Sequence, residues 1–366
     1  MTLFSDVDFS PQLIAILTEL ENREALFQML LIGNPELQIA KQIKKLGWEL
    51  KIIPQRGKLG SLLSFLLVSL EIIKYRPHTL FASGQYATII GIFLAKLLSV
   101  SNRVFIRHHS IIHHKYQMKL GMIMDRISNR MATSIIAVST VVKNILVQKE
   151  SVIPEKITVI YNGVDLIKFK MNFSLAKEDS IQHSEKTSLF HIGVISRMTE
   201  WKGVEYTASA FVRLQKEFPN SRLHIVGAFA DSYTDVQNIL SNVDSNRYTF
   251  EKSNSNIPLF LHGLDAFVHV PVGKDDEAFG IVYIEALASG IPCIFTQSGV
   301  LNELETPGRY VHLVGFRNSD EIYLNLKQLI QSKNESKVAV PESWLNQFSL
   351  DEMANRYVDF LLGVNR

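Results

Sequence analysis

Residues 188–227, SLFHIGVISRMTEWKGVEYTASAFVRLQKEFPNSRLHIVG, decide the fold class. The apolar run SLFHIGVIS (188–196) predicts a buried strand, VEYTASAFVRLQKEF (204–218) predicts a helix, and SRLHIVG (221–227) predicts a second strand. A strand followed by a helix and another strand forms a parallel pair, because the helix returns the chain to the same end of the sheet. This stretch therefore predicts an α/β domain with a parallel sheet.

The same alternation extends outward in both directions. Further strands are predicted at ALFQMLLIG (25–33), WELKIIP (48–54), LFAS (80–83), VFIRHH (104–109), SIIAVS (134–139), ITVIYNGVD (157–165), DAFVHVP (265–271) and IPCIFT (291–296). Helices are predicted from about Phe279, at EIYLNLKQLIQSK (321–333) and in the amphipathic tail 344–364. We therefore predict an α/β fold of two Rossmann-like, doubly wound domains that face a central cleft.

A polar stretch without periodicity, residues 171–187, separates the two alternating halves. We expect an N-terminal domain over 1–168, a linker over 169–187, a C-terminal domain over 188–344 and a helix over 345–366 that packs back toward the first domain. Neither half contains a G-x-G-x-x-G motif, so an NAD-binding domain receives little support.

The composition of the 366 residues, 46% apolar and 20% charged, is that of a globular protein. Cys293 is the only cysteine, which indicates a reducing compartment and excludes an internal disulfide. The N-terminus has no basic leader before an apolar run, so a signal peptide is not expected. The apolar stretches 59–73 and 86–100 are shorter than the about 20 residues of a membrane span. We expect a cytoplasmic protein.

The net charge of +2 hides an asymmetry between the two halves. Residues 41–149 hold 17 Lys and Arg against 3 Asp and Glu, a balance of +14. Such a segment suits phosphates or an anionic membrane surface. The all-round apolarity of 59–73 favours a buried core helix for that stretch itself. No nucleic-acid-binding module accompanies the charge, so nucleic acid is not expected as a partner.

Two groups of charged residues follow predicted strands of the second half. Arg197 and Lys202 come after the strand that contains Gly193, where a helix begins, and such a pair of cations suits a diphosphate leaving group. Glu277 and Glu285 form an E-x7-E pair around Gly280, and eight residues of helix would place them nearly on one face. A helix that starts at Gly280 would offer free N–H groups to a ligand. Two ordinary surface glutamates are the alternative.

A histidine-rich segment, RHHSIIHHKY (107–116), follows a strand of the first half. Histidine tracts bind metals, but no carboxylate or cysteine stands nearby in the sequence to complete a site. We therefore expect no metal, and we expect His113 and His114 to face solvent or an acceptor substrate.

The segments 191–228 and 265–303, together with IIAVSTVVKNILVQKESVIPEKITVIYNGVDLIKF (135–169), resemble retaining, nucleotide-sugar-dependent glycosyltransferases of family 4, which have the GT-B fold. The resemblance covers about residues 75–366. It implies that Glu277 contacts the donor sugar, that Glu285 contacts the ribose, and that Arg197 and Lys202 hold the diphosphate. It further implies that His109, or alternatively His108, reaches the donor sugar. Other donor-binding positions are expected at Gly193, Phe279, Gly280, Ile281 and Glu303.

Two positions depart from the family pattern. Val300 in SGVLNE (298–303) replaces a second glycine, and SDVDFSPQ (5–12) stands where many members have a glycine pair.

The resemblance implies a metal-independent, retaining transfer from a nucleoside diphosphate sugar to a glycan or lipid-linked acceptor, as in bacterial surface polysaccharide synthesis. No cofactor is expected, and the basic half predicts peripheral association with the inner face of the membrane. Two alternatives stay open: a catalytically silent sugar-nucleotide-binding subunit, and a sugar-nucleotide epimerase of the same fold.

Overall fold

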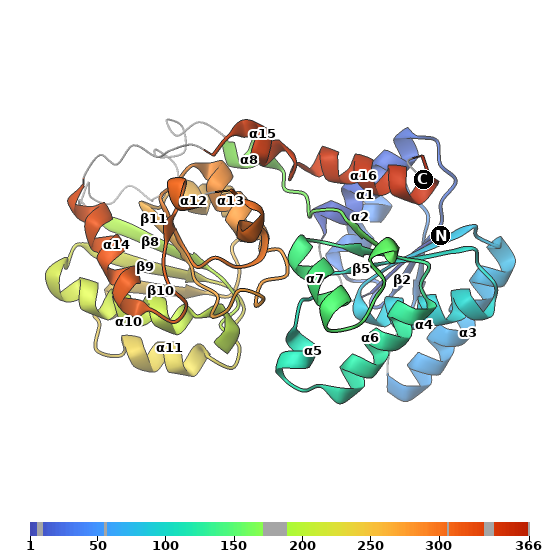
Figure 1. The fold of residues 1–366 in the computed structure, drawn as a ribbon, viewed down its shortest axis with the longest axis horizontal. Helices are drawn as coiled ribbons and strands as arrows, with labels where there is room; N and C mark the ends of the chain where they lie inside the picture. The colour runs from blue at the N-terminus through green and yellow to red at the C-terminus, as the bar shows by residue number, and fades with distance from the viewer. Residues whose placement is uncertain (6–9, 55–56, 171–188, 306, 333–339, 365–366) are drawn as a thin grey trace. The chain divides into compact units, whose positions relative to one another are not determined.

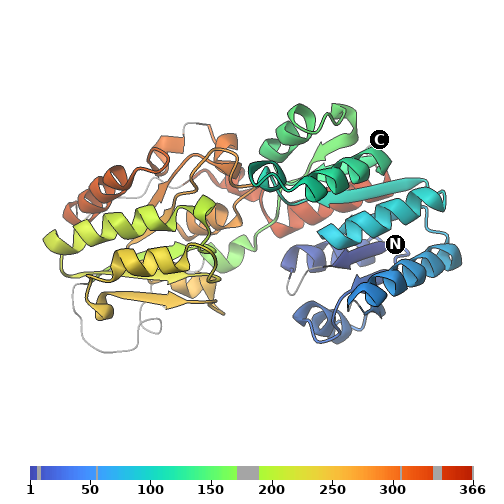
Figure 2. The ribbon, with the colours of Figure 1, turned by 90° about the horizontal axis from the view of Figure 1, so that it is seen from below.

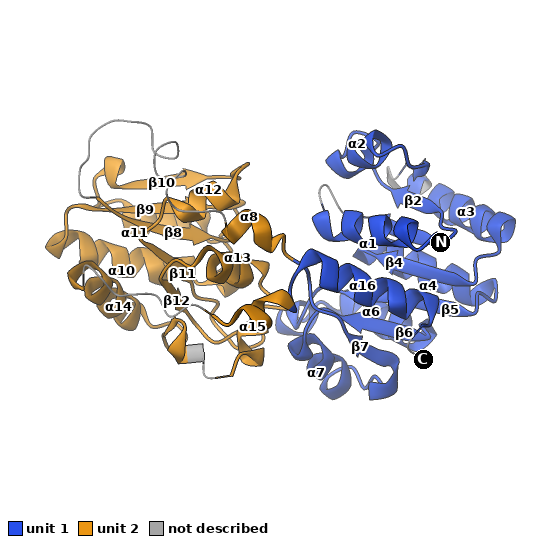
Figure 3. Ribbon diagram, turned by 90° about the horizontal axis from the view of Figure 1, so that it is seen from above, with its two compact units in different colours: residues 1–163, 347–366 blue, residues 164–346 orange. Residues whose placement is uncertain are grey.

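The computed structural model describes the chain except for residues 6–9, 55–56, 171–188, 306, 333–339 and 365–366. The chain divides into two compact units (Figure 3). Unit 1 holds residues 1–163 and 347–366, and unit 2 holds residues 164–346. The predicted linker lies mostly outside the described residues, although the helix α8 (Leu166–Lys170) includes its first two positions.

Unit 1 is built on a parallel sheet with the order β3-β2-β1-β4-β5-β6-β7. Its strands are β1 (Thr2–Ser5), β2 (Met29–Ile32), β3 (Leu50–Ile53), β4 (Thr79–Ser83), β5 (Asn102–Arg107), β6 (Ser134–Ala137) and β7 (Ile157–Val159). The chain adds β2 and β3 on one side of β1 and then crosses to add β4 on the other. The strand order reverses at β1 and β4, which is where doubly wound sheets bind ligands.

Helices cover both faces of this sheet (Figure 1). They are α1 (Pro11–Asn22), α2 (Gln38–Lys45), α3 (Gly57–Tyr75), α4 (Gln85–Leu97), α5 (Ile112–Lys115), α6 (Lys119–Met131), α7 (Thr140–Gln148) and α16 (Leu350–Leu362). Serine side chains fix several helix starts: Ser10 accepts from the Leu13 amide, and Ser139 accepts from the Val142 amide. The C-terminal helix α16 packs beside α1.

Unit 2 repeats the pattern with the order β10-β9-β8-β11-β12-β13. Its strands are β8 (Phe190–Ile195), β9 (Ser221–Val226), β10 (Tyr248–Glu251), β11 (Ala266–His269), β12 (Cys293–Phe295) and β13 (His312–Leu313). Its helices, besides α8, are α10 (Val204–Glu217), α11 (Tyr233–Leu240), α12 (Ile257–His262), α13 (Ile281–Ser289), α14 (Ser319–Gln331) and α15 (Glu342–Asn346). The order reverses between β8 and β11.

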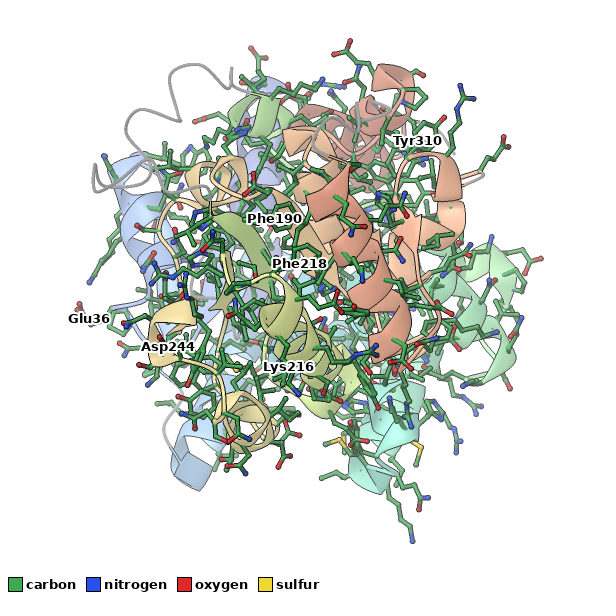
Figure 4. The ribbon with its side chains drawn as sticks, turned by 90° about the vertical axis from the view of Figure 1, so that its left-hand side faces the viewer. Glu36, Phe190, Lys216, Phe218, Asp244 and Tyr310 are labelled. Atoms are coloured by element: carbon green, nitrogen blue, oxygen red, sulfur yellow. The ribbon has the colours of Figure 1, made fainter. Side chains whose placement is uncertain are left out.

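The core of unit 2 lies between the sheet and its helices. Phe211 of α10, Ile225 of β9 and Leu326 of α14 are fully buried in one apolar cluster. Phe190 and Phe218 pack against this cluster, whereas Lys216 lies exposed on α10 (Figure 4). The two parallel sheets with interleaved helices confirm the predicted fold class.

Several sequence expectations are wrong in detail. The alternation begins at β1, earlier than the predicted run 25–33. The tail holds two helices instead of one, because Ser349 starts α16 by accepting from the Glu352 amide. The stretch 59–73 is no buried core helix, since Leu62, Leu66 and Leu70 of α3 are exposed. No helix of the described residues is long and apolar enough to cross a membrane.

Candidate active site

The first candidate group lies in unit 2, at the carboxyl ends of β8 and β11. The chain leaves β8 through the loop that carries Arg197 and the 3-10 turn Glu200–Lys202, and it leaves β11 through the loop that carries Glu277. The two loops are held together, because the Val272 amide donates to the Trp201 carbonyl at 3.1 Å. The crossing point of the sheet thus places both predicted motifs at one edge.

Three side chains meet at this edge. The Lys202 ammonium pairs with Glu277 Oε1, and His269 Nε2 lies 2.8 Å from the same oxygen. Glu277 and His269 are buried, and the Lys202 side chain is 14% exposed. In the described structure both donors go to Oε1.

The electrostatics keep Glu277 ionised. Burial alone would raise its pKa, but the Lys202 charge and the His269 hydrogen bond outweigh burial and lower the pKa of Glu277 to about 2. Burial also lowers the pKa of His269, although its contact with Glu277 opposes that shift. A neutral His269 therefore donates from Nε2 to a carboxylate that stays charged at neutral pH.

Glu277 belongs to a loop and not to a helix. The helix α13 begins at Ile281 with Gly280 as its N-cap, so the expected placement of Glu277 and Glu285 on one helical face is wrong. Gly280 has φ +82°, and a Cβ there would lie 2.5 Å from the Tyr283 ring. The Glu277 amide donates to Ser298 Oγ at 3.2 Å, which anchors the loop to the segment after β12. The first amides of α13 follow directly, and such amides have no partner within their helix.

Arg197 differs from Lys202 in its surroundings. Its side chain is exposed, and its guanidinium carbon lies 5.8 Å from the centre of the Trp201 ring. Among the described residues Arg197 has no carboxylate partner. Gly193 lies within β8, where a Cβ would meet Leu264 Cδ1 at 2.1 Å, so packing already explains this glycine. Its role in donor binding stays a prediction.

The remaining predicted donor-binding residues surround α13. Glu285 is half-buried on α13, and burial raises its pKa to about 7. Phe279 is buried, and its carbonyl accepts from the Val300 amide at 2.8 Å. Val300, at the position of the missing glycine, is therefore a packed residue of the 3-10 turn Gly299–Glu303. Ile281 and Glu303 are half-buried, and their roles in donor binding stay predictions.

The second candidate group lies in unit 1, around the predicted histidines. His108 is exposed after β5, and its Nε2 lies 3.4 Å from Ser83 Oγ at the end of β4. His109 Nε2 lies 3.2 Å from Asp125 Oδ2 and its ring lies 4.6 Å from that of His113. Which of the two contacts a donor sugar stays a prediction.

The expected surroundings of the histidines are wrong in two respects. His113 is buried and not facing solvent, with Nδ1 2.6 Å from Asp125 Oδ2. A carboxylate does stand nearby, because α6 brings Asp125 to the segment that follows β5. The acceptor atoms of His109, His113 and Asp125 could by their spacing hold a metal ion. Arg107, however, donates to the same Asp125 oxygen at 3.0 Å and also pairs with Glu150, so this cluster is a buried ion-pair network.

Sequence reasoning missed His269 and Asp125. His269 is the one polar residue in the strand AFVH, which ends at the ligand-binding edge, and that position could have indicated it. Asp125 lies 16 residues from its partner His109 along the chain, and only the tertiary structure joins them.

Comparisons with known proteins place these features in a family. The model described as Glycosyl transferases group 1 matches residues 176–342, and the model Glycosyltransferase Family 4 matches residues 39–168. The capsular polysaccharide biosynthesis glycosyltransferase CapM of Staphylococcus aureus is 23% identical over 349 residues, 88% of each chain. The O-antigen chain mannosyltransferase RfbU of Salmonella typhimurium is 27% identical over 209 residues, 56% of this chain and 54% of that protein.

The structure of HepE from Anabaena, solved with UDP and glucose, superposes with a TM-score of 0.81, covers 98% of both chains and shares 20% sequence identity, which shows a common fold. The two parallel sheets and the matched family models define a transferase of the GT-B class. The chain is a glycosyltransferase like those of family 4.

Proposed function

We propose that this glycosyltransferase moves a sugar, with retention of anomeric configuration, from a nucleoside diphosphate sugar to a glycan or lipid-linked acceptor in bacterial surface polysaccharide synthesis. The contact of Lys202 and His269 with the buried Glu277 beside the start of α13 carries this proposal. CapM is named for capsular polysaccharide biosynthesis, RfbU is named as an O-antigen chain mannosyltransferase, and HepE was solved with UDP, which supports the same assignment.

Each residue of the unit 2 site has a role in this proposal. Arg197 and Lys202 stabilise the negative charge that develops on the departing diphosphate, together with the first amides of α13. Glu277, held by His269, accepts from a hydroxyl of the donor sugar through Oε2. Glu285 contacts the ribose from the second turn of α13. In unit 1, His109, with His108 as the alternative, reaches the sugar.

The reaction leaves the proton of the acceptor hydroxyl to be taken up as the new bond forms. The proposed route gives this proton to the departing phosphate on the same face of the sugar, which accounts for retention. The glycosidic bond to the diphosphate breaks, and the bond to the acceptor oxygen forms. The enzyme acts at the inner face of the membrane, where a lipid-linked acceptor is available.

The test is transfer from a panel of labelled UDP-, GDP- and ADP-sugars to a glycolipid extract, with the anomeric configuration of the product read by NMR. We expect one nucleotide to serve as donor and the product to keep the donor's configuration. A product of inverted configuration would overturn the retaining mechanism. Isomerised donor without transfer would identify an epimerase, and donor binding without turnover would identify a silent subunit.

A further inference from the structure

The helices α3, α4 and α6 lie side by side on one face of the sheet of unit 1 (Figures 1 and 2). The central helix α4 contacts both of its neighbours. Figure 2 views this layer from outside, so the surface seen there is the outer surface of the three helices.

The outer surface of α3 is apolar. Leu62, Leu66, Leu70 and Ile73 follow one another at helical spacing and are 69%, 53%, 50% and 53% exposed. The residues turned toward the sheet include two polar ones: Ser64 and Glu71 are buried, and Glu71 binds Lys51 and Gln28. The usual amphipathic pattern is therefore partly reversed in α3. Packing of the core does not explain leucines on its outer side.

The apolar surface continues over the neighbouring helices. Phe93 and Leu97 are exposed on α4, and the Phe93 ring lies 6.0 Å from that of Phe65 on α3. Leu120, Ile123 and Ile127 are exposed along one side of α6. We call the outer surface formed by these residues of α3, α4 and α6 the leucine face. Exposed apolar patches that extend over several elements mark interaction sites.

The exposed charges that the structure describes on these helices have one sign. Of the side chains that the structure describes on α3, α4 and α6, the exposed charged ones are all basic: Lys74, Lys96, Lys119, Arg126 and Arg130. The two acidic residues of these helices, Glu71 and Asp125, are buried and paired with Lys51 and Arg107. A surface of leucines among cations matches the interface of an anionic bilayer. A second copy of the same face would instead bring like charges together.

We propose that the leucine face docks on an anionic membrane, with the leucines of α3 inserted between headgroups and the basic side chains on lipid phosphates. The proposal gives the membrane association in the proposed function a specific surface. It rests on the proposed function only for its biological purpose, since docking requires no sugar transfer.

The first experiment is cosedimentation of the full chain with vesicles of phosphatidylcholine, with and without phosphatidylglycerol. We expect binding to the anionic vesicles that weakens with salt, because exposed charges are screened within about 10 Å at 0.1 M. The variant L66Q/L70Q should bind at least about tenfold more weakly, since each leucine loses an apolar contact with the acyl region. L324Q, on an exposed leucine of α14 in unit 2, is the matched control and should bind like the wild type.

Charge and location are tested separately. K96E/R126E should weaken binding about fivefold or more per charge, and K216E on α10 should leave it unchanged. A polarity-sensitive dye on L66C should shift to shorter wavelength with anionic vesicles, whereas the dye on L324C should not. The native Cys293 is buried, so it does not compete for the label.

Equal binding of L66Q/L70Q and the wild type, or no binding to anionic vesicles at low salt, would overturn the proposal. A wild-type dimer that L66Q/L70Q converts to a monomer, without vesicle binding, would assign the face to a second copy. Nucleoside diphosphate binding by the wild type is measured in parallel, without vesicles. If the wild type binds no nucleoside diphosphate, that result counts against the proposed function but not against membrane docking.

Discussion

At the scale of single residues, the two cations of the unit 2 site are not equivalent. Lys202 is mostly buried and pairs with Glu277, so it has a structural role before any substrate binds. Arg197 is exposed beside Trp201 and has no carboxylate partner among the described residues. Removing one or the other should therefore separate an effect on stability from an effect on chemistry.

Arg197→Ala should lower kcat/KM about 30- to 1000-fold, which corresponds to roughly 2–4 kcal/mol of transition-state stabilisation, and leave the unfolding free energy nearly unchanged. Lys202→Ala should lower kcat/KM similarly and also cost about 3 kcal/mol of stability, because Glu277 is left buried without its cationic partner and keeps only the contact with His269. Steady-state kinetics and urea unfolding of both variants measure the two effects. Near-normal turnover of both variants would remove these residues from the mechanism.

The buried Glu277 also predicts a pH dependence of stability. Its pKa of about 2 in the folded state lies below the ordinary value of 4.5. The stabilisation is therefore complete above pH 4.5 and is lost as the pH falls toward 2, by about 3 kcal/mol in total.

Unfolding of unit 2 in the wild type and in Glu277→Gln between pH 5 and pH 2.5 measures this loss. The wild type and Glu277→Gln should differ less in their free energy of unfolding as the pH falls. Glu305→Gln, which changes an exposed carboxylate, is the control, and its free energy of unfolding should differ from that of the wild type by the same amount at each pH. A constant difference for Glu277→Gln as well would show that Glu277 is not held as a carboxylate.

At the scale of elements, the start of α13 organises the site. Gly280 must adopt φ +82°, and its missing side chain leaves room for the Tyr283 ring. Gly290 at the other end of α13 has φ +64°, and a Cβ there would meet no atom within 4 Å. Both glycines therefore need a positive φ, but only at Gly280 would an added Cβ clash with a neighbouring side chain.

Gly280→Ala should lower the unfolding free energy by about 1–2 kcal/mol for the backbone conformation plus a further cost of about 1–3 kcal/mol for the contact with Tyr283. Gly290→Ala should cost the backbone part alone. Thermal unfolding of the two variants provides the comparison. Equal losses of unfolding free energy in the two variants would indicate that the first turn of α13 shifts freely to make room for the Cβ. That result would contradict a preorganised site.

The helix α13 also bears on whether sugar transfer requires a metal ion. In the proposed function, the dipole of α13, Lys202 and Arg197 provide positive charge for the diphosphate, which is the task that a divalent cation performs in other sites. We therefore predict that transfer activity survives EDTA. Loss of activity with the chelator, restored by Mn²⁺ or Mg²⁺, would show that these groups do not suffice.

At the scale of the whole molecule, the sequence predicts the two alternating halves well, because buried parallel strands form distinct apolar runs. It misses β1, β10 and β13, of which β10 and β13 lie at sheet edges. The motifs and their resemblance to family 4 indicate Lys202 and Glu277, but their direct contact depends on the crossing of the chain between β8 and β11. The contacts of His269 with Glu277 and of Asp125 with three basic side chains join distant segments, and periodicity carries no information about them.

The central claim is that the Lys202–Glu277 site binds the diphosphate of a nucleotide sugar, and calorimetric titration with UDP, GDP and ADP tests it most directly. We predict that one of these nucleotides binds at a single site and that Lys202→Ala raises its Kd about 10- to 150-fold. Lys216→Ala, on the exposed side of α10, should leave the Kd unchanged. Equally tight binding to Lys202→Ala, or no binding of any nucleoside diphosphate to the wild type, would contradict the account.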